Sequence, residues 1–102
     1  MKTFRFKHFP CVAVLAKYHN DRIAIQLRAP DDGEPIATAT VNLPATPMEP
    51  DEAAIKNYSE NEGIEDVLIK EGILMLGTVK TVQTGYAKVP VYKVNLNYFK
   101  TT

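Results

Sequence analysis

Strict alternation of apolar and polar side chains between residues 22 and 28 constrains the fold of this chain more than any other feature. In the run RIAIQLR, the side chains of Ile23, Ile25 and Leu27 project to one side of an extended backbone. This two-residue period is typical of an antiparallel strand with one face on a core and the other toward solvent. The sequence therefore predicts a sheet.

The same alternation recurs elsewhere and predicts further strands at residues 3–9, 12–18, 36–43, 77–83 and 86–99. Short turn sequences separate several of these runs, including His19-Asn20-Asp21, PDDGEP and Thr84-Gly85. Pro90 lies inside the last run and predicts an edge strand or a bulge there, because proline cannot donate a hydrogen bond to a sheet. Residues 52–57 fit a short strand and a helical turn equally well.

One segment has a helical pattern. Ser59 and Glu62 fit a capping box, and Gly72 is placed to end the helix in a left-handed conformation. Apolar residues three and four apart lie between them at Ile64, Val67 and Leu68. The chain is therefore predicted to be one α+β domain over residues 1–102. It is expected to have a mainly antiparallel sheet of five or six strands and one main helix at about residues 60–71.

Charge is strongly segregated although the net charge is zero. Residues 31–71 hold eleven acids and two bases, which gives −9, and the rest of the chain carries +9. One interpretation is that the two blocks fold back on each other. The other is an acidic face that docks a basic partner, because segregated charge steers such encounters.

The single cysteine, Cys11, excludes an intrachain disulfide and favours a reducing cytoplasm. No apolar run approaches the roughly 18 residues that a membrane-spanning helix needs, so no membrane partner is expected. The basic start and the short run CVAVLA are interpreted as strands rather than as a signal peptide.

The sequence gives little support for catalysis, metal binding or a cofactor. His8 and His19 are eleven residues apart and lack partners at the spacing of a zinc site. Cys11 is expected to pack in the core and Ser59 to cap the helix, so neither is predicted to be a nucleophile. We therefore expect a protein that is not an enzyme and has no cofactor.

Direct nucleic-acid binding is also disfavoured. Phe4 and Phe6 lie on the strand face opposite Arg5 and Lys7, which is typical of core residues rather than of a base-stacking surface. A net charge of zero adds little affinity for phosphates.

Four stretches together resemble a known family: GEPIATATVNLP (33–44), DEAAIKNYSENEGI (51–64), KEGIL (70–74) and TGYAKVPVYKV (84–94). This family consists of small proteins with a domain of unknown function, encoded by phages, plasmids and integrative elements of gut bacteria. The resemblance implies a mobile-element protein in the cytoplasm of a bacterial host, where small proteins of this kind often act against host defence. It implies no catalytic or binding residue.

These observations lead to a first hypothesis of a stoichiometric, anti-CRISPR-like inhibitor that binds a basic groove on a host defence effector. Its candidate partner-binding residues are Asp51, Glu52, Glu60, Glu62, Glu65 and Asp66.

Two alternatives stay open. The first is a small-molecule binder that sequesters a nucleotide signal through Asn57, Tyr58, Thr84, Gly85 and Tyr86. The second is an accessory protein of element maintenance that forms a homodimer through an exposed strand edge near Pro90.

Overall fold

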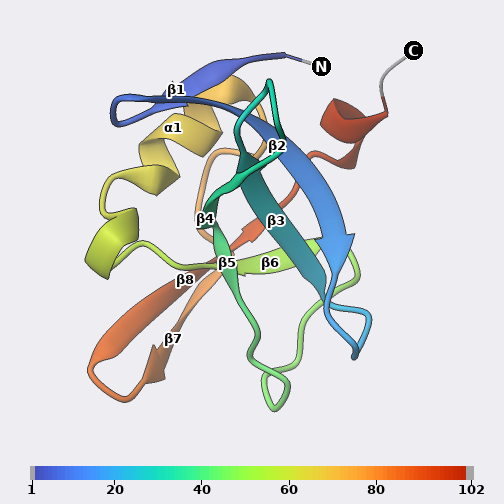
Figure 1. The fold of residues 1–102 in the computed structure, drawn as a ribbon. Helices are drawn as coiled ribbons and strands as arrows, with labels where there is room; N and C mark the ends of the chain where they lie inside the picture. The colour runs from blue at the N-terminus through green and yellow to red at the C-terminus, as the bar shows by residue number, and fades with distance from the viewer. Residues whose placement is uncertain (1, 101–102) are drawn as a thin grey trace.

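The alternating segments form two four-stranded antiparallel sheets, which the computed structural model describes over residues 2–100. The first sheet has the order β1-β2-β3-β4, with β1 at Phe4–Phe6, β2 at Phe9–Lys17, β3 at Ile23–Arg28 and β4 at Pro35–Thr38. The second has the order β5-β6-β8-β7, with β5 at Thr40–Val41, β6 at Glu52–Ile55, β7 at Lys80–Thr84 and β8 at Ala87–Lys93. One helix, α1 at Ile64–Glu71, and two 3₁₀ turns, η1 at Ser59–Asn61 and η2 at Leu96–Phe99, complete the fold (Figure 1). The predicted α+β class is confirmed, but the described residues form eight strands in two sheets rather than five or six in one.

The predicted strand at 36–43 is divided between the two sheets. Its break is Ala39, whose amide donates to the Ile25 carbonyl of β3 at 2.8 Å. The Ala39 carbonyl accepts from the Lys56 amide, just beyond β6, also at 2.8 Å. One residue thus hydrogen-bonds to both sheets, and its small side chain is fully buried. The chain crosses from the first sheet to the second at this point.

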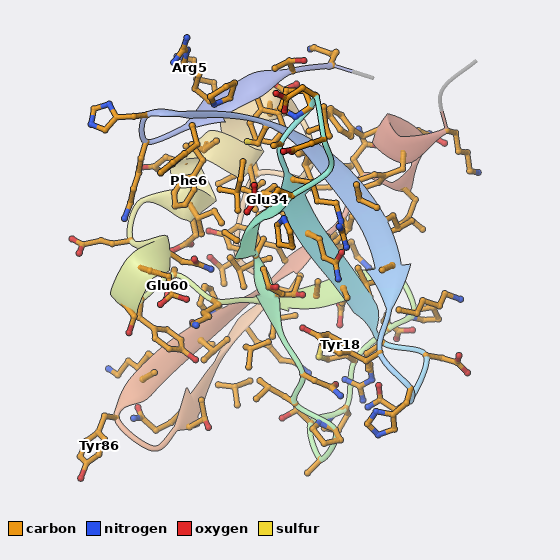
Figure 2. All side chains as sticks on the ribbon, viewed as in Figure 1. Arg5, Phe6, Tyr18, Glu34, Glu60 and Tyr86 are labelled. Atoms are coloured by element: carbon orange, nitrogen blue, oxygen red, sulfur yellow. The ribbon has the colours of Figure 1, made fainter. Side chains whose placement is uncertain are left out.

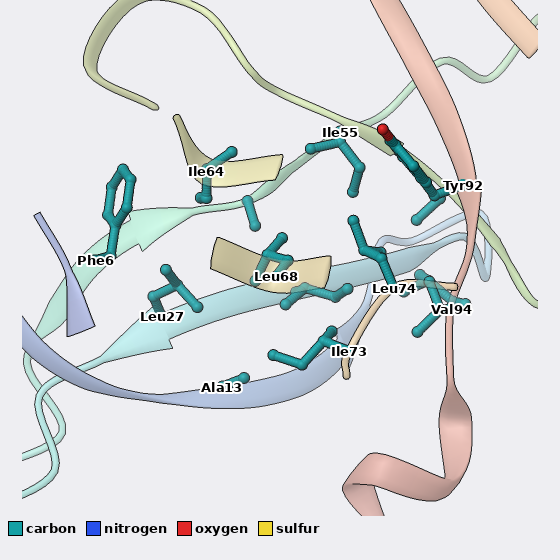
Figure 3. Packing of buried hydrophobic residues seen from close by; sticks show 14 of the residues in the cluster. Phe6, Ala13, Leu27, Ile55, Ile64, Leu68, Ile73, Leu74, Tyr92 and Val94 are labelled. Carbon is teal, nitrogen blue, oxygen red and sulfur yellow. The ribbon is translucent and has the colours of Figure 1, made fainter. Parts of the chain in front are cut away.

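The core lies between the two sheets and α1. Ile25 and Leu27 from β3, Ile55 from β6, and Ile64 and Leu68 from α1 are all fully buried in it (Figure 3). A smaller cluster on the opposite face of the second sheet contains Ala54, Val89 and Val91. β6 contributes to both clusters, because Ala53 and Ile55 face the main core while Ala54 faces the smaller one. All four residues of β6 are therefore buried, and the ambiguous segment 52–57 begins as a strand.

The predicted capping box at Ser59 and Glu62 is wrong. Ser59 begins the separate turn η1, and no side chain caps either η1 or α1. The residue that precedes α1 is Gly63, which has a left-handed φ of 89°. This conformation redirects the backbone between η1 and α1, so Ser59 is not at the helix N-terminus. The C-terminal end of α1 is as predicted, because Gly72 has φ 87° and its amide donates to the Leu68 and Ile69 carbonyls.

The predicted hairpin around Thr84-Gly85 is confirmed: β7 and β8 pair from Lys80↔Val91 to Thr84↔Ala87. The expectation that Pro90 marks an edge strand is wrong, since β8 lies between β6 and β7. The ladder between β6 and β8 extends only from Lys93 to Val91. Pro90 lies just past its end, so its missing donor removes no bond from that ladder.

Candidate functional site

Two of the six candidate acids, Asp51 and Glu52, pair with Lys93. The Lys93 ammonium lies 3.1 Å from the Asp51 carboxylate and 3.8 Å from that of Glu52. The hydrogen bond to Asp51 raises the pKa of Lys93. The Glu52 side chain is buried and also accepts from the Glu49 amide at 2.9 Å. These bonds tie the acidic segment to the basic C-terminal strand β8, as the fold-back interpretation of the charges predicts.

Glu65 has a structural environment as well. Its carboxylate accepts a hydrogen bond from the Asn57 side-chain amide and another from the Tyr92 hydroxyl, each at 2.5 Å. Burial, and then the bond to Glu65, raises the pKa of Tyr92. The network joins α1 to β8 and to the segment after β6. Glu65 is therefore occupied within the fold, which leaves it little capacity to bind a partner.

The remaining three acids form an exposed group that we call the acidic corner: Glu60, Glu62 and Asp66. Figure 2 places Glu60 on η1, next to the start of α1. Its carboxylate pairs with Lys56 at 2.7 Å, which lowers the pKa of Glu60. Within residues 2–100, neither Glu62 nor Asp66 has a cation within ion-pair distance. The acidic corner thus keeps two exposed carboxylates for an external cation.

The five alternative small-molecule residues do not meet in one cavity. The Asn57 amide is bonded to Glu65, and Tyr58 packs on the smaller cluster with Val82 and Ala87 of the hairpin. Tyr86 lies at the hairpin turn, fully exposed and pointing away from the body (Figure 2). Tyr58 is therefore half-buried against the hairpin, whereas the Tyr86 ring projects into solvent from the turn of the same hairpin.

The sequence analysis missed an open groove of about 640 Å³ at the end of the first sheet. Its lining consists of Phe9, Pro10, Ala29, Pro30, Asp31, Glu34, Pro35 and Ile36. Six of these eight side chains are apolar and two are carboxylates, so the groove suits an apolar group that carries a cation. The segment PDDGEP signalled only a turn, because Phe9 and Pro10 join it through the sheet and not through the sequence.

The other candidates for chemistry are separate from one another. Within residues 2–100, no three side chains of His, Cys, Asp and Glu gather as a metal site. Ser59 has a positive φ of 56° and belongs to η1. Cys11 is fully buried in the main core, and burial raises the pKa of its thiol.

Native Cys11 is expected to react with iodoacetamide at least about a hundredfold more slowly than Cys11 of the unfolded chain, because alkylation requires β2 to open. Mass spectrometry of samples alkylated in buffer and in guanidinium chloride, at one pH, measures both rates. Equal rates would show that the thiol is accessible, contrary to its burial.

No α-helix within the described residues is long and apolar enough to span a bilayer. No family model, no curated protein and no solved structure matches the chain.

Proposed function

We propose that this chain is a non-enzymatic protein that binds a basic surface of a host protein through the acidic corner. In the setting implied by the family resemblance, that host protein is a defence effector, and the chain acts as a stoichiometric, anti-CRISPR-like inhibitor in the bacterial cytoplasm.

The observation that carries the proposal is the position of Glu62 and Asp66. Both side chains are exposed; Asp66 is in the first turn of α1, and Glu62 lies just before the helix, on the other side of Gly63. Of the other acids, Glu60 pairs with Lys56, and Asp51 and Glu52 share the ammonium of Lys93. Uncompensated charge at the acidic corner would attract a basic groove and orient the two proteins as they meet.

The test compares two double variants that each change the net charge by +4. The pair E62K/D66K reverses the two uncompensated charges of the acidic corner. The pair E34K/E49K reverses two other exposed acids whose side chains form no ion pair within residues 2–100. Glu65 is left unchanged, because its reversal would break the bonds to Asn57 and Tyr92 and disturb the fold.

Tagged protein is incubated with host lysate at low and moderate salt, and bound proteins are identified by mass spectrometry. We expect the native chain and E34K/E49K to retain the same defence nuclease or CRISPR effector, more weakly at higher salt. E62K/D66K is expected to lose it, with a dissociation constant for the purified partner raised by about tenfold or more. Equal retention by both variants would contradict a role for the acidic corner, and equal loss would indicate nonspecific charge attraction.

A further inference from the structure

β7 is an open and unprotected sheet edge. It is the outermost strand of the second sheet, and its hairpin with β8 projects from the body of the protein (Figure 1). Natural edges are commonly protected by shortness, charge or proline. The other edge strands fit that rule, because β1 has three residues with a central Arg5, β5 has two, and β4 begins with Pro35. β7 has five residues, KTVQT, with one charge at its first position and no proline.

The single charge of β7 is already engaged. The Lys80 ammonium donates to the Pro47 carbonyl, which draws the side chain toward the loop before β6. The remaining residues of the strand are uncharged: Thr81, Val82, Gln83 and Thr84. No charge on the strand therefore stands in the way of a second uncharged strand.

Exposed apolar side chains adjoin both ends of this edge. Before β7 lie Met75, Leu76 and Val79, and Leu76 is 87% exposed. After it lies Tyr86 at the hairpin turn, which is fully exposed. Apolar side chains gathered beside an open strand mark an interaction surface rather than an ordinary solvated one.

The pairing with β8 fixes which backbone groups of β7 are free. Thr84 pairs with Ala87 across a two-residue turn, and alternate residues of β7 direct their amides and carbonyls at β8. These are Thr84, Val82 and Lys80. The amides and carbonyls of Thr81 and Gln83 point the other way, toward the open side of the sheet.

We infer that β7 pairs antiparallel with β7 of a second copy of this chain, about a two-fold axis at Val82. This register places Thr81 of one copy opposite Gln83 of the other, so the outward amides and carbonyls of both residues find partners. It also places Lys80 opposite Thr84 of the second copy, so that no like charges face each other. The surface is self-complementary, as a two-fold dimer requires.

The same register brings the exposed apolar groups together. β7 ends at Thr84, so the turn Gly85-Tyr86 of one copy comes next to Val79, which directly precedes β7 of the other. The two second sheets then form one eight-stranded sheet, with Val82 meeting its equivalent at the centre. No residue of the acidic corner lies on β7 or in its hairpin turn, so dimerisation extends the proposed function and does not depend on it.

Sedimentation velocity from about 1 µM to about 1 mM covers the range of weak and moderate homodimers. The native chain is expected to shift from monomer to dimer in this range. Thr81→Pro removes an outward amide of β7 and is expected to leave a monomer at every concentration. The double variant L76K/V79K changes only exposed side chains and is expected to weaken the dimer about tenfold or more by charge repulsion and loss of apolar contact.

The matched control is Leu15→Lys, which adds a charge at another exposed apolar site, on β2. It is expected to dimerise like the native chain, and circular dichroism checks that every variant is folded. A native chain that stays monomeric to about 1 mM overturns the inference. A folded Thr81→Pro variant that still forms a dimer overturns it as well. If Thr81→Pro does not fold, L76K/V79K provides the test, and a folded L76K/V79K variant that dimerises like the native chain overturns the inference.

Discussion

Replacing Leu68 by alanine is expected to lower the free energy of unfolding by about 2 to 5 kcal/mol, the range for buried leucines that leave a cavity. Leu68 is fully buried in the main core, where α1 meets both sheets (Figure 3). Its carbonyl also accepts from the Gly72 and Ile73 amides, so its position is fixed by the backbone. The surrounding side chains therefore have little freedom to close the cavity.

Urea denaturation followed by circular dichroism measures this loss. Leu15→Ala is the matched control, because it removes the same atoms from a side chain that is 38% exposed. The control is expected to cost about 1.5 kcal/mol or less, because part of the removed surface already contacts water and no closed cavity is left behind. Similar losses for the two variants would mean that α1 is not packed on the sheets as the structure places it.

The local sequence pattern predicted the elements in which one face is buried and the other is more exposed. Ile25 and Leu27 are buried on either side of the half-buried Gln26, and β3 forms where the alternation predicts a strand, although Ala24 is buried too. β6 has no such contrast, because both of its faces are buried, and its sequence therefore fitted a strand and a helical turn equally. The break at Ala39 has no local signal either, since it arises from bonds to two segments that are distant in the sequence.

The helix start shows how a motif can match and still be wrong. Ser59 and Glu62 have the spacing of a capping box, yet Gly63 follows them directly. A glycine adopts a left-handed conformation at little energetic cost, so the chain turns there and α1 begins afterwards. The hydrogen bonds of a capping box at Ser59 and Glu62 would not be strong enough to keep Gly63 in a helical conformation.

Only tertiary contacts distinguish the candidate acids that are bonded within the fold from those that are free to bind a partner. Sequence places Glu62, Glu65 and Asp66 within five residues of one another, and all three looked equally suited to a partner. Glu65 differs because the Tyr92 hydroxyl, 27 residues away, reaches its carboxylate. Neither the helical nor the strand period of the sequence predicts this contact between Glu65 and Tyr92. The acidic corner is therefore a smaller surface than the charge of segment 31–71 predicts.

Asn61 connects η1 to the first sheet and was not singled out by its sequence pattern. It is fully buried, and its side-chain amide donates to the Thr38 carbonyl at 2.7 Å. Its side-chain oxygen is buried without a hydrogen-bond partner in the described residues. The site therefore suits a neutral donor and offers nothing to stabilise a negative charge.

Asn61→Asp is expected to lower the free energy of unfolding by about 3 kcal/mol or more at pH 7, because it leaves an unpaired buried charge of nearly the same shape. Lys56, the lysine that pairs with the neighbouring Glu60, is already engaged by that carboxylate. Burial raises the pKa of the new carboxyl in the folded state above its unfolded value of about 3.9, so the folded variant binds the extra proton more tightly. Its stability relative to the native chain should therefore rise as the pH falls from 7 toward 4, where the protonated carboxyl can donate to the Thr38 carbonyl.

Urea denaturation of the native chain, Asn61→Asp and Asn61→Ala between pH 4 and pH 8 separates this charge effect from simple loss of the side chain. Asn61→Ala should lose about 1 to 3 kcal/mol, equally at every pH, because it removes one buried hydrogen bond and adds no titrating group. The gap between the two variants should widen with pH by at most about 1.4 kcal/mol per unit. A gap that does not change with pH would mean that the introduced carboxylate is solvated, and that Asn61 does not occupy the buried position described.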